Sequence, residues 1–205
     1  MRRTHIHSSA TRLVATSTAL GALVLAGAGS TAAHAAEPYA YSTTLTFDKN
    51  PSDPSNSRLY WRVFRTYESG RQVKVREVSW RAGSGLGVKN ECTKNRGWLP
   101  NGYYDVTLYM QYNGSAIKGV VFKLSDKKCA AGTATRTELF IHSEMTRTGG
   151  QGGIESQRWT DRNPNDYLSQ GCIKLNPTDV KALAAQYQQY HRAGTAVRGK
   201  LAVVS

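Results

Sequence analysis

Two short segments of this chain carry side chains that can perform nucleophilic chemistry. Cys172 lies in the run SQGCIKL, and His142 ends the hydrophobic run LFIHS. A thiol needs a base or a positive neighbour to react at neutral pH. Three of the five histidines precede residue 35, which leaves His142 and His191 further along the chain. We therefore expect Cys172 to be a nucleophile and His142 its base, against the plainer interpretation that both are buried core residues.

The residues around Cys172 suit attack on a carbonyl. Gly171 has no side chain, so a substrate can approach the backbone closely there. Backbone N–H groups near Gln170 and Gly171 can stabilise an oxyanion. One nitrogen of His142 must be held by an acceptor, which the carbonyl of Ser143 or another backbone group nearby can supply. These residues supply the elements that a thiol acyl-transfer enzyme needs.

The other two cysteines suit a structural bridge. With Cys92, Cys129 and Cys172 present, three pairings are possible and one thiol is left over. Cys92 and Cys129 both lie in polar, loop-like surroundings, whereas Cys172 enters a strand. We expect a disulfide between Cys92 and Cys129, worth about 3–4 kcal/mol, and a free Cys172.

The N-terminal segment 1–35 is predicted to be a secretory signal peptide. Arg2, Arg3 and Arg12 form a basic start, an apolar core follows, and Ala33-His34-Ala35 fits a cleavage site. The alternative is a retained membrane anchor, but the apolar run is short and interrupted by polar residues. We expect export without a stable membrane anchor, and a protein that is extracellular or associated with the cell wall.

The positive net charge of the chain favours an anionic binding partner. Removing residues 1–35 takes away three of the 27 basic residues and none of the 14 acidic ones, so the net charge falls from +13 to +10. Export argues against nucleic acid as a partner, which leaves anionic cell-wall polymers or lipid headgroups. The charges are scattered, so an ordinary solvated surface is the competing interpretation. Residues 36–205 suffice for one domain, which we expect to be monomeric.

The hydrophobic pattern predicts a mainly β fold with one late α-helix. Aromatic residues and period-two alternation favour strands, with a hairpin turn at 68–71 and a break at the glycines of 83–87. Asn176 and Pro177 begin the expected helix, an apolar stripe follows, and Gly194 is expected to end it. The expected strands are 43–47, 59–67, 72–81, 103–112, 117–124, 137–142 and 195–204.

A long segment without periodicity separates the two reactive residues. It spans 143–168 and contains Gly149-Gly150-Gln151-Gly152-Gly153. Long irregular loops in compact domains are usually functional or mobile, so we expect a rim over Cys172, against an idle surface excursion. Trp159 and Tyr167 either line a substrate groove or anchor this segment.

Ile-His-Ser followed by Ser-x-Gly-Cys-Ile-Lys resembles the active-site signature of the L,D-transpeptidases, the YkuD-type catalytic domain. The resemblance extends over most of residues 36–205, including the hairpin from Arg58 to Val78 and the segment Pro100-Asn101-Gly102-Tyr103. It implies a β-sandwich or barrel domain that remodels peptidoglycan. No metal site and no cofactor are implied.

The resemblance also implies a reaction and its residues. Cys172 would attack the amide between the diamino acid and the terminal D-alanine of a stem tetrapeptide, and His142 would move the protons. Ser143 and Gly171 complete the implied catalytic set. Ser169, Gln170 and Lys174 would contact substrate or the oxyanion, with Ser169 alternatively a simple turn residue.

Two other functions remain open at this point. An L,D-carboxypeptidase would resolve the thioester with water instead of an amine. A non-catalytic protein that binds the cell wall, or inhibits its enzymes, would keep the same fold without chemistry. Gln170, which stands where many family members have histidine, and the long segment 143–168 motivate this last possibility.

Overall fold

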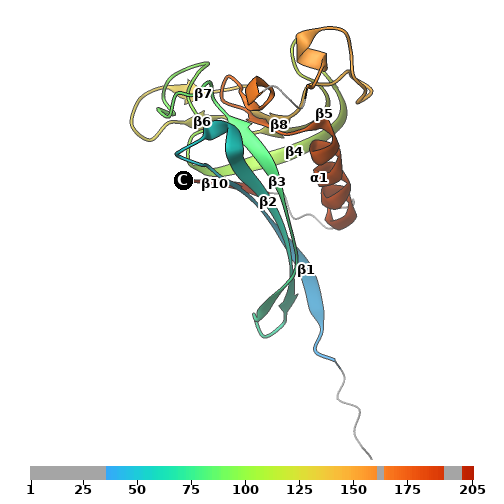
Figure 1. Cartoon of the computed structure of the whole chain (residues 1–205). Coiled ribbons are helices and arrows are strands. Elements are labelled where there is room, and N and C mark those ends of the chain that lie inside the picture. The colour runs from blue at the N-terminus through green and yellow to red at the C-terminus, as the bar shows by residue number, and fades with distance from the viewer. Residues whose placement is uncertain (1–35, 161–163, 192–199) are drawn as a thin grey trace, which may run out of the picture. The chain divides into compact units, whose positions relative to one another are not determined.

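The fold is mainly β, as the sequence predicts. A computed structural model describes residues 36–160, 164–191 and 200–205, so the expected signal peptide lies outside the described residues. Glu37–Ser205 belong to one compact unit. Within it eight strands close a barrel in the order β1-β10-β4-β5-β8-β9-β3-β2 (Figure 1). The barrel strands are β1 Tyr39–Asp48, β2 Ser57–Tyr67, β3 Gln72–Ser84, β4 Gly102–Asn113, β5 Lys118–Leu124, β8 Phe140–His142, β9 Ile173–Lys174 and β10 Lys200–Val204.

The first three strands form an antiparallel meander whose register follows the apolar alternation. Leu59, Trp61 and Val63 of β2 are buried, and the residues between them are at least partly exposed. β2 turns into β3 at the predicted hairpin, where Gly70 has φ 82°, a conformation that glycine adopts without strain. β1 also pairs with β10 in parallel, with Leu45 opposite Leu201, and this pairing closes the barrel.

The predicted helix is confirmed at its start and along its apolar stripe. α1 spans Pro177–Tyr190, and the side chain of Asn176 accepts from the N–H of Thr178 at 2.9 Å. Val180, Leu183 and Ala184 are buried against the barrel. Burying such a stripe is what stabilises a surface helix. The described helix ends at Tyr190, and the expected stop at Gly194 lies outside the described residues.

His191 follows the helix and caps its end. Its backbone N–H donates to the carbonyl of Tyr187 at 2.9 Å, and its ring stacks on the Tyr187 ring with centroids 4.2 Å apart. Nε2 lies 2.8 Å from Thr43 Oγ1 on β1. These contacts tie the end of the helix to the first strand.

Several strand boundaries differ from the prediction. β3 continues through Gly83 and Ser84, because these residues pair with Lys174 and Ile173 of β9. β8 covers only Phe140–His142 of the predicted 137–142, since Glu138 has φ 52° and leaves the extended conformation. β1 begins at Tyr39, four residues early, because Tyr39 pairs with Tyr67. Residues 195–199 of the predicted last strand lie outside the described residues.

Short elements complete the fold. β6 Lys127–Lys128 and β7 Thr135–Arg136 form a separate two-stranded ribbon. The 3-10 helices are η1 Pro54–Asn56, η2 Glu155–Gln157 and η3 Pro164–Tyr167. Within the described ranges, no helix is long and apolar enough to cross a membrane.

Candidate active site

Cys172 and His142 line the same cavity. It has a volume of about 430 Å³, and its wall also includes Ser143, Ser169 and Lys174. Gln170 lies on its rim as an exposed residue. The structure therefore brings together six of the seven residues that we singled out around the two motifs. The seventh, Gly171, shapes the backbone behind Cys172.

Strand pairing explains why the two side chains lie on the same face of the sheet. β8 and β9 are parallel neighbours, with Ile141 directly opposite Ile173, and both isoleucines are fully buried in the core. Successive side chains of an extended chain point to opposite faces. His142 follows one isoleucine and Cys172 precedes the other, so both face away from the core. Strand spacing puts the Cα atoms of such diagonal neighbours roughly 8 Å apart.

His142 is held as a neutral base. Its Nδ1 lies 3.2 Å from the carbonyl oxygen of Ser143, so Nδ1 carries the proton and donates it there. Burial and, to a lesser extent, the charge of Lys174 together lower the pKa of His142 to about 3, against a raising effect of the Ser143 carbonyl. The imidazole is therefore uncharged at neutral pH, with Nε2 available to accept a proton.

Cys172 rests as a protonated thiol. Its side chain is buried, and Sγ donates to the carbonyl of Glu138 at 3.6 Å. Burial raises the pKa of Cys172 to about 11, although a backbone hydrogen bond with Phe140 and the charges of Arg136 and Lys174 lower it. The thiol must lose its proton when substrate arrives, and a neutral histidine in the same cavity is suited to take it.

Ser169 organises the turn that presents Cys172. Its hydroxyl donates to the carbonyl of Cys172 at 2.6 Å and accepts from the N–H groups of Gly171 at 3.2 Å and Gly85 at 3.3 Å. The Gly171 N–H is thus engaged within the turn. Of the two roles considered for Ser169, these contacts support the turn residue.

Both the backbone conformation at position 171 and the atoms packed around it favour glycine. Its φ of 116° is rarely adopted by other residues, and an added Cβ would lie 2.0 Å from Nη2 of Arg136. Arg136 is itself buried and donates to the carbonyl of Gln170 at 2.9 Å. Arg136 could not be predicted from the sequence, because nothing in its neighbours Thr135 and Thr137 marks it as buried.

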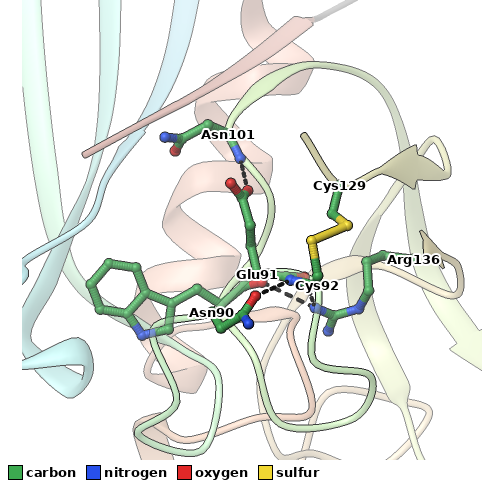
Figure 2. Close-up of a disulfide and its surroundings, with 7 residues drawn as sticks. Asn90, Glu91, Cys92, Asn101, Cys129 and Arg136 are labelled. Atoms are coloured by element: carbon green, nitrogen blue, oxygen red, sulfur yellow. Dashed lines mark hydrogen bonds between the residues drawn. A yellow bond between two sulfur atoms is a disulfide. The ribbon is translucent and has the colours of Figure 1, made fainter. Parts of the chain in front are cut away.

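The predicted disulfide is confirmed beside Arg136. Cys92 and Cys129 are bonded, and Cys172 is free. Figure 2 shows Arg136 next to the bridge, where Nη1 donates to the carbonyl of Glu91 at 2.7 Å. The same nitrogen donates to the carbonyl of Trp98 at 3.2 Å. The disulfide therefore fixes the loop on which Arg136 rests, and Arg136 in turn supports the turn before Cys172.

Lys174 makes a buried ion pair that the sequence pattern does not predict. Its Nζ donates to Oε1 of Glu144, and both side chains are about nine-tenths buried. Glu144 also lines the cavity. Carboxylate oxygens of Glu144, Glu155 and Asp166 lie within 4.8 Å of one another. Glu144 follows the histidine by only two residues, and the Ile-His-Ser-Glu run was the signal that could have identified it.

Within the described parts of the long segment, 143–160 and 164–168, side-chain hydrogen bonds and ring contacts hold the backbone in place. Gln151 donates to the carbonyl of Glu144 at 3.0 Å and accepts from the N–H of Trp159 at 2.6 Å. The ring of Trp159 meets that of Tyr167 edge to face at 4.9 Å. Tyr167 is buried, so these two aromatics anchor the segment and do not form the cavity wall. The wall includes Ser143, Glu144, Ser156 and Leu168 from the segment.

Gly83 allows the end of this segment to approach the barrel. A Cβ at Gly83 would lie 2.2 Å from the carbonyl oxygen of Tyr167. The guanidinium of Arg81 also packs over the Tyr167 ring at 4.0 Å. β3 therefore sets the position of the residues that lead into the Cys172 turn.

Comparison with known proteins yields no relative. No protein-family model, curated protein or solved structure matches this chain.

Proposed function

We propose that this chain is an exported cysteine L,D-transpeptidase that acts on peptidoglycan stem tetrapeptides. The single observation that carries the proposal is that His142 ends β8, Cys172 directly precedes the parallel neighbour β9, and both residues line one cavity. The motif resemblance supplies the substrate class, and the predicted signal peptide supplies the location. The disulfide is consistent with an oxidising compartment.

The first half-reaction forms a thioester. As the substrate carbonyl enters, Nε2 of His142 takes the thiol proton, and sulfur forms a bond to the carbonyl carbon. The tetrahedral intermediate collapses by breaking the C–N bond to D-alanine, whose amine receives the proton from His142. The Ser143 carbonyl supports the imidazolium that exists between these steps, because Nδ1–H donates to it.

The second half-reaction reverses the proton path. An acceptor amine attacks the thioester carbon, His142 removes its proton, and the C–S bond breaks to restore the thiol. Water in place of the amine would give hydrolysis and a carboxypeptidase. Mass analysis of the products from isolated muropeptides separates these activities, since cross-linked dimers report transfer and trimmed monomers alone report hydrolysis.

Covalent labelling tests the chemistry itself. A carbapenem should add to the wild-type protein in a one-to-one ratio, as intact-mass spectrometry can show, and Cys172→Ala should remain unlabelled. His142→Gln should slow labelling at pH 7 by at least a hundredfold, because it removes the base. A wild-type protein that stays unlabelled but binds cell-wall sacculi would favour the non-catalytic alternative.

A further inference from the structure

We propose that Glu144 binds a protonated primary amine of the substrate. The inference rests on the function proposed above, because it names a group that the substrate of this cavity carries. Glu144 lines the cavity together with Cys172 and His142. It is 8% exposed, so a ligand reaches it through the cavity and not from the general surface.

Only one of the two carboxylate oxygens of Glu144 has a hydrogen-bond partner within the described part of the chain. Oε1 accepts from Lys174, whereas Oε2 is buried and has no hydrogen-bond partner among the residues that the structure describes. The adjacent Ser143 is 2% exposed, and its Oγ likewise lacks a partner within the described part of the chain. Buried acceptors are nearly always paired. Two unpaired oxygens on consecutive residues of one cavity wall indicate that a donor from a ligand completes them.

The charge around Glu144 favours a cation. Glu144, Glu155 and Asp166 bring three carboxylates within 4.8 Å. Lys174 pairs with Glu144, and Arg158 pairs with Glu155 at 2.8 Å. These five residues together carry a net charge of −1. Burial raises the pKa of Glu144, and Asp166 and Glu155 add to that effect, although Lys174 opposes it. A second cation would relieve this repulsion.

A primary ammonium fits the site better than a metal ion. Ca²⁺ and Mg²⁺ require six or more oxygen ligands, counting waters, and the Lys174 ammonium already occupies one oxygen of Glu144. A divalent ion beside that ammonium would be repelled. A primary ammonium needs few acceptors, carries a single charge and offers three donors. The diamino acid of a stem peptide carries such a group on the residue whose carbonyl Cys172 would attack.

The proposal predicts that binding depends on the free amine. The protein would carry Cys172→Ala to prevent turnover, and calorimetry would measure binding of tetrapeptides with lysine or diaminopimelate as the diamino acid. Each peptide would be tested in two forms, one with a free side-chain amine and one with that amine acetylated. For at least one diamino acid we expect acetylation to weaken binding tenfold or more. Adding Glu144→Gln should reduce that factor to less than two, and adding Glu77→Gln should leave it unchanged, because Glu77 is ion-paired on the barrel and does not line the cavity.

Three results would overturn the proposal. Acetylation would have no effect with either peptide, or the tenfold preference would survive Glu144→Gln. The third such result is that micromolar Ca²⁺ binds the peptide-free protein and abolishes the preference for the free amine, which would identify a metal site. If Glu144→Gln does not fold, Glu155→Gln replaces it. That side chain is 69% exposed, and its loss should reduce the preference two- to threefold; an unchanged preference contradicts the proposal.

Carbapenem labelling of the wild-type protein separates the two claims. Labelling without an amine preference contradicts only the Glu144 subsite. An amine preference without labelling contradicts the transpeptidase and leaves an amine-binding cavity.

Discussion

Arg136 donates from Nη2 to the carbonyl oxygen of Gln170 at 2.9 Å and lies directly behind Gly171. The same guanidinium donates to the carbonyls of Glu91 and Trp98, which lie on either side of the bridged Cys92 in the chain. A buried cation with several carbonyl acceptors is well satisfied. Arg136, which is 34 residues from Gln170 in the sequence, therefore holds the turn that presents Cys172.

Gly171→Ala should damage both stability and reactivity. The new Cβ would meet the Arg136 guanidinium at 2.0 Å, and φ 116° is strained for alanine. We expect a loss of about 2–4 kcal/mol in the free energy of unfolding, measured by urea denaturation, and greatly slowed carbapenem labelling. Gly153→Ala is the matched control, because an added Cβ there meets nothing within 4 Å. Equal stability of both variants would show that Gly171 is not required.

Ser169→Ala should loosen the Cys172 turn. The substitution leaves the carbonyl of Cys172 and the N–H groups of Gly171 and Gly85 without their shared partner. Unsatisfied buried groups cost about 1–3 kcal/mol each, so we expect a loss of about 2 kcal/mol or more in unfolding free energy. Labelling should be slower but not abolished. Abolished labelling with unchanged stability would assign Ser169 to catalysis instead.

Removing the disulfide should destabilise the support of the site. The double variant Cys92→Ala and Cys129→Ala should lose about 3–4 kcal/mol by loop entropy, measured by urea denaturation. Reduction of the wild-type protein should give a similar loss, and the variant should show no further change on reduction. A variant as stable as the oxidised wild-type protein would contradict this expectation.

The buried His142 should make the protein sensitive to acid. Its pKa is about 3 when folded and 6.5 as the reference value, so the unfolded state binds more protons between these pH values. The unfolding free energy should therefore fall as pH falls through this window, by up to about 1.4 kcal/mol per pH unit. His142→Gln should flatten this part of the stability curve, as denaturation at several pH values can measure. Parallel curves for the two proteins would show that His142 does not titrate as described.

The sequence predicted the parts of the site that local pattern controls. Cys172 and His142 stand in short motifs, and the cysteines at 92 and 129 lie in polar loops, so residue type and spacing were informative. The start of α1 was predictable because Asn176 and Pro177 are local signals. The mainly β fold followed from alternation.

The missed features depend on tertiary contacts. Arg136 and Glu144 matter through partners 34 and 30 residues away, Gln170 and Lys174. β8 is short because Glu138 has a positive φ, which its residue type does not indicate. β3 is long because β9 pairs with Gly83 and Ser84. In each case a neighbour in space overrides the local propensity.

The central claim is that Cys172 forms a thioester with a stem peptide. Wild-type protein would be mixed with a stem tetrapeptide, quenched in acid, and analysed by intact mass and peptide mapping. We predict an adduct on Cys172 with the mass of the tetrapeptide less D-alanine, released D-alanine in solution, and no adduct on Cys172→Ala. A folded wild-type protein that releases no D-alanine and carries no adduct, with either diamino acid in the peptide, would contradict the account.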